Sequence, residues 1–398
     1  MNTDFSHALL LHYNQRHAPH IIRWLKEAFG CKVTCLIVDL GEIRDPAGIV
    51  ASLIAAGAEE AIHLDARVRF ADEVIARAIK ANAVYEGGYH LSAALARPLL
   101  AMEATACCRS MGMDVVVHGF RGNDQVRMEM GFQSLGQPSI AALARMNLED
   151  AVVDAYAREH GIPEVFGTLN PYSTSENLWG KSIECGPLEN PWHEAPRETW
   201  SYVKPVESTP LEAAYLEIGF EAGIPVALDG ERAALGTLVE RLNQTASEHG
   251  VGRTDIVENG FVGLKSRAIY ESPAAHCLIL AHADLEGFTS NCHEAAFKRL
   301  VDARWTDMVY CGRWFDPAMA HLNAYIDSQN RFVTGSVRLK LHRGSARVVG
   351  RRSACAVYDP DRAIYQFGHG FAKADASATA SLANLPTMAL RAARGEFA

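Results

Sequence analysis

Ala8-Leu9-Leu10-Leu11, followed by His12-Tyr13-Asn14-Gln15-Arg16-His17-Ala18-Pro19, is an apolar strand that runs through a turn into a helix from about His20. In α/β nucleotide-binding folds this turn holds phosphate through glycines and small hydroxyls, because backbone N–H groups must approach the anion closely. This stretch contains no glycine, and bulky side chains occupy residues 13–16. It therefore predicts a nucleotide-binding type of fold in which the usual phosphate loop is degenerate.

Strands and helices alternate through the first third of the chain. Apolar patterning predicts strands over 32–40, 61–64 and 114–117, and helices over 22–29, 47–56, 70–81 and 91–111. Such alternation with short connections predicts a parallel, doubly wound sheet with helices on both faces. Ligands of such sheets bind beyond the carboxyl ends of the strands.

The pattern changes beyond about residue 165. Prolines and glycines punctuate residues 170–192, which predicts a long, irregular, ligand-facing loop. The segments that follow predict an α+β domain, with strands over 215–220, 224–228, 254–257, 261–264, 337–341 and 346–349, and helices over 236–249, 293–302 and 317–329. The stretch from about Ala376 predicts either a helix that reaches another subunit or a loosely ordered terminus.

Composition excludes several classes of partner. The 398 residues carry a formal net charge of −9, with lysine and arginine scattered, so we expect no nucleic-acid partner and no acidic membrane surface. We find no targeting segment and no apolar run of membrane-spanning length, and we expect a cytoplasmic protein. The nine cysteines contain no CxxC pair and predict no disulfide framework.

A polar constellation lies in His118-Gly119-Phe120-Arg121-Gly122-Asn123-Asp124-Gln125-Val126-Arg127. A strand is expected to end here, and Asn123 and Asp124 are placed to cap the next helix. The carboxylate of Asp124 suits an ammonium group, and the guanidinium of Arg127 suits a ligand carboxylate or pairs with Asp124. The group therefore fits a zwitterionic amino acid. The alternative is a capped helix with a surface ion pair.

Several further motifs accompany this one in a fixed order. They are Tyr85-Glu86-Gly87 with Tyr89, Leu95-Ala96-Arg97-Pro98, Ser175-Glu176-Asn177-Leu178-Trp179-Gly180-Lys181-Ser182, residues 249–259, Lys265-Ser266-Arg267 with Ile269-Tyr270-Glu271, and residues 333–341. Together they resemble the argininosuccinate synthase family from about Leu9 to Tyr365. Several long motifs in one order are far more specific than a single short match.

The resemblance implies a fold and a reaction. In that family an ATP-pyrophosphatase-type domain, similar to the adenine nucleotide alpha hydrolases, adenylates the ureido oxygen of citrulline, and the amine of aspartate then displaces AMP. The implied division is an ATP-pyrophosphatase-like domain over 1–167, a synthetase domain over 168–370 and a C-terminal oligomerisation tail over 371–398. The family also implies a homotetramer.

Most substrate-binding positions keep the family's residue type. The positions that match citrulline contacts are Tyr89, Asn123, Arg127, Ser173, Ser182, Glu258 and Tyr270. Asn123 and Asp124 match aspartate contacts. Hydroxyls of the family are replaced at Ala93 and Ala94. The candidate catalytic residues are Asp124, Glu258, His17 and His118, because carboxylates and histidines handle protons near neutral pH.

The departures concentrate on ATP. None of the family's Ser-Gly-Gly-Leu-Asp-Thr-Ser is retained over Tyr13, Asn14, Gln15, Arg16, His17, Ala18 and Pro19, and a second phosphate-side segment is shortened to Phe120-Arg121. Losing several charge-assisted hydrogen bonds, each of about 1.5–3 kcal/mol, predicts that ATP does not bind in the family's mode. We expect no cofactor, and the histidine spacing predicts no metal site.

Three functions are compatible with these residues. The first is an enzyme that binds a citrulline- or arginine-like amino acid and makes or breaks a C–N bond without family-type adenylation. The second is a non-catalytic amino-acid-binding or assembly homologue. The third is an authentic ATP-dependent citrulline–aspartate ligase with a rebuilt ATP site. The retained substrate residues favour the first.

Overall fold

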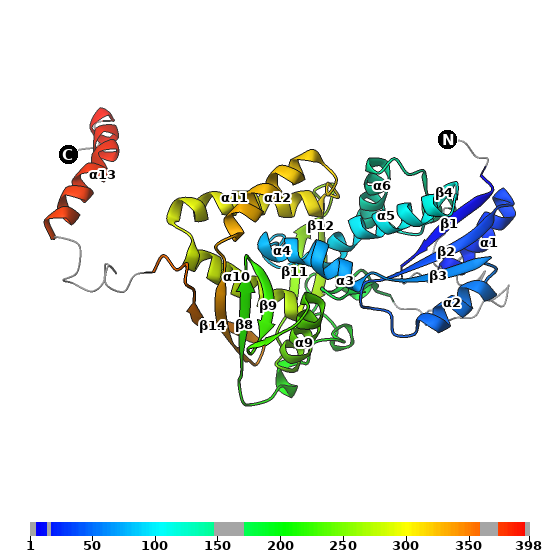
Figure 1. The fold of residues 1–398 in the computed structure, drawn as a ribbon, viewed down its shortest axis with the longest axis horizontal. Helices are drawn as coiled ribbons and strands as arrows, with labels where there is room; N and C mark the ends of the chain where they lie inside the picture. Colours follow the sequence, from blue (N-terminus) through cyan, green and yellow to red (C-terminus); the bar gives the residue numbers. More distant parts are fainter. Residues whose placement is uncertain (1–4, 14–16, 147–170, 359–372, 395–398) are drawn as a thin grey trace.

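A parallel sheet forms the centre of the N-terminal part of the molecule (Figure 1). The structure is a computed structural model that describes residues 5–13, 17–146, 171–358 and 373–394. Its strand order is β3-β2-β1-β4-β5, and all neighbouring strands run parallel. The strands are β1 (His7–His12), β2 (Lys32–Asp39), β3 (Glu60–Asp65), β4 (Val115–His118) and β5 (Ser139–Ala141).

Helices cover both faces of this sheet because alternate residues of the central strands point to opposite sides. Leu9 and Leu11 of β1 join one buried cluster, whereas Ala8 and Leu10 join another. The doubly wound prediction is therefore confirmed. The cluster with Leu9 and Leu11 includes residues of the π-helical segment η1 (Phe70–Ile75), α4 (Ala76–Lys80), α5 (Ser92–Ser110) and α6 (Gly122–Ser134). The cluster with Ala8 and Leu10 includes residues of α1 (Ala18–Phe29), α2 (Pro46–Ala55) and α7 (Ala142–Met146). The short helix α3 (Arg67–Arg69) precedes η1.

The strand order reverses between β1 and β4. From β1 the chain winds outward to β2 and β3, and it then returns to β4 and β5 on the other side. Ligands of open parallel sheets bind at such a reversal, beyond the carboxyl ends of the strands. Tyr13 follows β1 and Phe120 follows β4, so both substituted segments lie at this position.

Two antiparallel sheets build the second part of the molecule. One has the order β10-β9-β8-β13-β14 and the other β11-β12-β7-β6. The strands of the first are β8 (Ala214–Glu221), β9 (Ile224–Leu228), β10 (Glu231–Arg232), β13 (Gly335–His342) and β14 (Ser345–Arg352); those of the second are β6 (Ser173–Asn177), β7 (Gly180–Glu184), β11 (Arg253–Asn259) and β12 (Lys265–Glu271).

Helices pack around these sheets. They include α9 (Leu235–Glu248), α10 (Pro273–Thr289), α11 (Cys292–Tyr310) and α12 (Pro317–Asn330), with the short 3₁₀ segments η2 (Gly186–Glu189), η3 (Arg197–Thr199) and η4 (Val206–Ser208). Strands and helices mix in this part, and the predicted α+β class is confirmed.

Two local predictions were wrong, and one helix was missed. The predicted loop over 170–192 contains the hairpin β6–β7, whose polar residues pair through backbone hydrogen bonds. The predicted strand over 261–264 is a turn closed by a hydrogen bond from Gly263 N to Gly260 O, and Val262 and Leu264 are exposed there. Helix α10 was not predicted, because it is apolar on most sides and shows little amphipathic period.

The C-terminal helix α13 (Lys373–Ala393) agrees with the predicted helix from about Ala376. Its described side chains are exposed, and Figure 1 shows it apart from the two sheet-bearing parts. Its role at a subunit contact stays a prediction. Both predicted domain boundaries, 167/168 and 370/371, lie outside the described residues.

Glu271, at the end of β12, provides a test of how the loop over 201–203 is held. Its carboxylate is fully buried and accepts hydrogen bonds from the backbone N–H groups of Ser201, Tyr202 and Val203 at 2.7–3.2 Å. We expect Glu271→Ala to lower the free energy of unfolding by at least about 3 kcal/mol, because it leaves several buried donors unpaired at about 1–3 kcal/mol each. Denaturant unfolding measures this.

The matched control is Glu248→Ala, which removes an exposed carboxylate paired with Lys204. A change within about 0.5 kcal/mol is expected there. An equal effect of the two substitutions would show that Glu271 does not anchor the loop.

Candidate functional site

The candidate site combines elements from both parts of the chain. The bend before α5 and the first turn of α6 come from the N-terminal part, while β6, β7, β11, β12 and the end of α11 come from the second part. Hydrogen bonds cross between them: Asn177 Nδ2 donates to Ser92 O at 2.8 Å, and Trp179 Nε1 donates to His90 O at 2.8 Å. Both side chains are buried, so these contacts set the relative position of the two sets of residues.

Asp124 is the centre of the charged part of the site. Its Oδ1 accepts from Arg127 Nη1 at 2.8 Å and its Oδ2 from Arg97 Nη2 at 2.6 Å. Burial by itself would raise the pKa of this carboxyl, but the two guanidinium groups outweigh it and hold the pKa at about 2. Asp124 is therefore ionised and already paired. The two guanidinium groups of Arg97 and Arg127 share this one carboxylate.

The predicted capping role of Asn123 and Asp124 was wrong. Helix α6 begins at Gly122, its N-cap residue is Arg121, and no side chain caps it among the described contacts. The Asp124 carboxylate binds two buried guanidinium groups instead of backbone N–H groups. Asn123 Oδ1 accepts from Phe261 N at 3.3 Å, which ties the start of α6 to the β11–β12 turn.

Arg97 is a central residue to which the sequence interpretation gave no role. Its side chain is 2% exposed, and Nη2 also donates to Ser175 Oγ at 3.2 Å. The guanidinium lies 4.9 Å from the ring centroid of Tyr13 and 4.7 Å from that of Phe120. Its Nε and Nη1 are buried and have no hydrogen-bond partner in the described structure. The available signal was an arginine in the first half of α5, where no other residue is charged.

Tyr13 and Phe120 both contact Arg97. Tyr13 donates from its hydroxyl to Glu176 O at 2.7 Å, which joins the end of β1 to β6. Phe120 is buried, and its ring centroid lies 6.1 Å from that of Tyr13. Asn14, Gln15 and Arg16 lie outside the described residues. The two rings together form an aromatic contact for one arginine.

Four tyrosines line the region next to Arg127. Tyr89 stacks on Tyr270 with centroids 4.3 Å apart, and Tyr85 stacks on Tyr310 at 3.8 Å. The Tyr89 hydroxyl accepts from Ala93 N and Ala94 N, both at 3.1 Å, so it satisfies the uncapped start of α5. The predicted residues Tyr89 and Tyr270 are brought together. Tyr85 and Tyr310 were not predicted as site residues.

Arg127 is fixed against these rings. Its Nε donates to Tyr310 O at 2.7 Å, and its guanidinium lies 4.7 Å from the Tyr310 ring centroid. The side chain is almost fully buried. Such cation–π contact and hydrogen bonding hold the positive charge in one orientation.

Glu258 lies on β11 and is 4% exposed. Its Oε1 accepts from the Tyr310 hydroxyl at 3.4 Å, whereas its Oε2 is buried without a hydrogen-bond partner in the described structure. Burial raises the pKa of this carboxyl. An unpartnered carboxylate oxygen suits a ligand N–H group, because a buried acceptor without a donor is unfavourable.

The predicted serines differ in accessibility. Ser182 is buried on β7, opposite Ser175 of β6 and Tyr270 of β12 in the strand register. Ser173 is exposed at the start of β6. Only Ser182 is therefore placed within the packed part of the site.

The candidate catalytic histidines lie in different surroundings. His118 is fully buried at the end of β4, with its ring 5.8 Å from that of Phe120 and 5.9 Å from that of Phe132. Burial lowers its pKa to about 4, so it is neutral near pH 7. His17 is the N-cap residue of α1 and is buried. The geometry supports Asp124 and Glu258 as site residues more strongly than either histidine.

Over residues 5–13, 17–146, 171–358 and 373–394, no three His, Cys, Asp or Glu side chains gather as a metal site would require. In the same part of the chain, no helix has both the length and the apolar character needed to cross a bilayer.

Asp124→Asn tests whether one carboxylate organises the arginines. Since it leaves two buried guanidinium groups with a neutral partner, we expect a loss of about 3 kcal/mol in the free energy of unfolding at pH 7. The folded pKa of Asp124 lies below its unfolded value near 3.8. Its stabilisation is therefore present above about pH 4 and lost as the pH falls toward 2. Denaturant unfolding at pH 7 and pH 3 measures both effects.

The control is Asp72→Asn at an exposed position of η1. The difference in the free energy of unfolding between wild type and Asp124→Asn should shrink as the pH falls from 7 to 3. The difference between wild type and Asp72→Asn should be the same at both pH values. A difference between wild type and Asp124→Asn that is the same at pH 3 and pH 7 would contradict the assignment.

Family models match both parts of the chain. A model described as the arginosuccinate synthase N-terminal HUP domain matches residues 17–163. A second, described as the arginosuccinate synthase C-terminal domain, matches residues 172–390. Together they cover most of the sequence and agree with the two parts seen in the structure.

Curated relatives extend the same result. An argininosuccinate synthase of Dehalococcoides mccartyi strain BAV1 is 44% identical over 354 residues, covering 88% of this chain and 87% of the relative. That of Rubrobacter xylanophilus is 41% identical over 372 residues, 92% of this chain and 90% of the relative. That of Gloeobacter violaceus is 41% identical over 374 residues, which cover 92% of this chain and 93% of the relative.

These comparisons correct the expectation about ATP. We expected no cofactor and no ATP in the family's mode, on the strength of the substituted turn. Relatives at 41–44% identity carry the name of an enzyme family that uses ATP, and the N-terminal family model matches from residue 17 onward. The sequence of the turn after β1 was therefore not sufficient to exclude ATP, because side chains from other elements also contribute to a binding site. This chain belongs to the argininosuccinate synthase family.

Proposed function

We propose that this chain is an ATP-dependent ligase that joins the ureido carbon of citrulline, or of a closely similar amino acid, to the amine of aspartate. This replaces the reading we favoured from the sequence, a C–N bond reaction without adenylation. The observation that carries the proposal is the charge pattern of the site: a buried positive end at Arg97 and Arg127, and a buried carboxylate oxygen of Glu258 without a donor.

The positive end supports carboxylate recognition. Arg97 and Arg127 share the single carboxylate of Asp124, and Nε and Nη1 of Arg97 are buried without an acceptor in the described structure. Desolvated charge is costly unless it is paired. The carboxylate of an amino-acid substrate supplies the missing negative charge, and guanidinium groups suit it because their N–H donors match its two oxygens.

Glu258 supports recognition of a nitrogen-bearing group. Its Oε2 would accept an N–H of the substrate, and the stacked Tyr89 and Tyr270 rings would give the aliphatic part of an amino acid an apolar wall. The raised pKa of Glu258 also suits proton transfer, because a carboxyl closer to the working pH accepts and releases a proton more readily. We propose Glu258 as the acceptor for a proton leaving the attacking amine.

We place ATP, in this proposal, at the reversal of strand order between β1 and β4, because ligands of open parallel sheets bind there beyond the carboxyl ends of the strands. ATP would activate the ureido oxygen of the substrate. The match of the N-terminal family model to residues 17–163 supports this role.

Several expectations from the resemblance accompany this proposal. We propose a homotetramer with α13 at its subunit contacts and a cytoplasmic location, both on the ground of family membership. We do not include His118 as a proton donor, because it is neutral and packed between phenylalanines.

The reaction itself is the direct test. Purified protein with ATP, Mg²⁺, L-citrulline and L-aspartate should form argininosuccinate, AMP and pyrophosphate, detected by mass spectrometry. Reactions that lack ATP, or that contain L-asparagine in place of L-aspartate, are the controls. If calorimetry detects L-citrulline binding but no product forms, the chain is an amino-acid-binding homologue. If neither is observed, the proposed substrate is wrong.

Two variants test the roles of Glu258 and Ala94. Glu258→Gln keeps the shape of the side chain but cannot take up a proton, so we expect kcat to fall at least about 100-fold with a smaller change in KM. Ala94→Ser restores a family hydroxyl and should tighten L-citrulline binding severalfold. Steady-state kinetics and calorimetry measure these effects.

Tyr215→Phe, at an exposed position of β8, is the control for both variants. An unchanged kcat in Glu258→Gln would remove Glu258 from the proton-transfer step without affecting the family assignment.

A further inference from the structure

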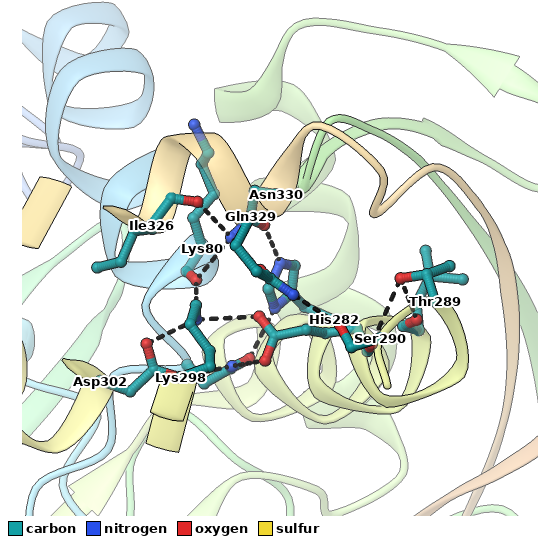
Figure 2. A network of polar contacts seen from close by, with 12 residues as sticks. Lys80, His282, Thr289, Ser290, Lys298, Asp302, Ile326, Gln329 and Asn330 are labelled. Atoms are coloured by element: carbon teal, nitrogen blue, oxygen red, sulfur yellow. Dashed lines mark hydrogen bonds and ion pairs between the residues drawn. The ribbon is translucent and has the colours of Figure 1, made fainter. Parts of the chain in front are cut away.

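A second buried polar cluster lies away from the candidate site, where the end of α4 meets α10, α11 and α12 (Figure 2). Its ionisable members are His282 and Glu286 on α10 and Lys298 and Asp302 on α11. Lys298 and His282 are fully buried, and Glu286 and Asp302 nearly so. Nothing in the proposed reaction uses these groups.

Lys298 is held by several partners. Its Nζ lies 2.6 Å from Asp302 Oδ1 and 2.9 Å from Glu286 Oε2, and it donates to the backbone oxygen of Lys80 at 2.8 Å. Figure 2 shows the ammonium between Asp302 and the backbone oxygen of Lys80. One buried positive charge therefore faces two carboxyl groups and the C-terminal end of α4.

His282 makes an unusual pair of contacts. Its Nδ1 lies 2.6 Å from Asn82 Oδ1, and its Nε2 lies 2.7 Å from Asn330 Oδ1. A neutral imidazole has one donor and one acceptor nitrogen, so it cannot donate to both oxygens. Two oxygens at these distances match a ring with both nitrogens protonated.

The orientations of the two amides are set by other partners. Asn82 Nδ2 lies 3.0 Å from Asp302 Oδ2 and 3.2 Å from Glu286 Oε1. If the amide were turned so that its O and N atoms changed places, its oxygen would face two carboxylate oxygens and could form no hydrogen bond with them. Asn330 Nδ2 donates to Ile326 O at 3.0 Å and Lys80 O at 3.2 Å, which are acceptors only. Its oxygen must therefore face His282.

The charge count leads to the same result. With Lys298 charged, both carboxyls ionised and His282 neutral, the buried cluster would carry one net negative charge. One additional proton makes it neutral and completes the hydrogen bonding of His282. We propose that the folded protein holds this extra proton, shared between His282 and Asp302, and that the proton keeps Asn82 and the chain after it in place.

The proton is shared because opposing effects act on both groups. Burial raises the pKa of Asp302 to about 7, against the opposing effect of Lys298. Burial and Lys298 lower the pKa of His282, whereas its hydrogen bond to Asn330 raises it. A proton on Asp302 would require Asn82 to turn its oxygen toward that carboxyl. Since the sites are coupled, the titration belongs to the cluster as a whole.

The other charged groups nearby have their own partners. The Lys80 ammonium pairs with Asp327 of α12, and Arg77 of α4 lies 3.8 Å from the same carboxylate. Burial raises the pKa of Tyr325 on α12, and the charges of Glu294, Glu286 and Asp302 add to this effect. On the β8 side, His282 faces the ring of Phe220, with centroids 6.0 Å apart. These described groups do not supply the missing proton.

Asn82 links the cluster to the candidate site. Its backbone has φ of +43°, a conformation that most side chains rarely adopt, and Ala83 after it is fully buried. The chain then forms the bend in which Tyr85 N donates to Tyr89 O at 2.7 Å and Tyr89 N donates to Tyr85 O at 3.1 Å. We therefore assign Asn82 as a positioning residue for this bend, acting through the proton-bound cluster.

The first experiment counts the proton through stability. Asp302→Asn resembles a protonated aspartate, so its cluster is neutral without the extra proton. Unfolded Asp302 titrates near 3.8, so above about pH 5 the folded wild type holds one proton more than this variant. As the pH rises, the unfolding equilibrium constant of wild type, divided by that of Asp302→Asn, should therefore increase by up to tenfold per pH unit. The increase should stop at the pH where the cluster has released its proton.

Glu286→Gln provides the same comparison from the other carboxyl, in case Asp302→Asn does not fold. Asp327→Asn, on α12 but outside the buried cluster, is the control and should remain parallel to wild type. Denaturant unfolding from pH 5 to pH 9 measures the curves. Parallel curves for wild type and the folded cluster variant would overturn the proposal, and so would failure of both variants to fold at every pH.

The second experiment tests the positioning role without any ligand. Asn82→Gly keeps the positive φ but removes the side chain, so we expect faster amide hydrogen exchange at residues 85–89, measured by mass spectrometry. In wild type the same amides should gain exchange, beyond the intrinsic effect of pH, as the cluster loses its proton. Unchanged protection in Asn82→Gly would show that the cluster does not position the bend.

Discussion

The carboxylate of Asp124 is the constraint on which the candidate site depends. It lies between Arg97 of α5 and Arg127 of α6, and its negative charge makes the burial of two guanidinium groups possible. Arg97 in turn contacts Tyr13, Phe120 and Ser175, while Arg127 contacts Tyr310. One ionised group therefore connects the parallel sheet, the hairpin β6–β7 and the end of α11.

Tyr13 and Phe120 are far apart in the sequence, where we expected two separate departures from the family's phosphate-binding segments. In the folded molecule both rings lie against the same guanidinium, and the Tyr13 hydroxyl is bonded to β6. The two residues therefore belong to one local contact around Arg97. That arginine also has buried N–H groups without an acceptor in the described structure.

The sequence predicted the doubly wound sheet and many of its elements, because β-branched and leucine-rich strands alternate clearly with helices. It also identified Tyr89, Asp124, Arg127, Glu258 and Tyr270, which the structure gathers. It did not identify Arg97, Tyr85 or Tyr310 as site residues, since each contacts the site through a partner distant in the chain. The hairpin β6–β7 was missed because its strands are polar, and α10 because its burial on several sides hides the helical period.

What the sequence determined by itself was local: the strand-to-helix order, the absence of a glycine turn and the family to which its motifs point. The tertiary structure decided which charges meet. Asp124 was expected to cap a helix, but two arginines from different helices compete successfully for it. Likewise, His282 and Asp302 look unremarkable as residue types, and only their burial beside Lys298 and two amides creates a site for a proton. Burial and pairing determine the energy of a charge, and both depend on neighbours that the linear sequence does not show.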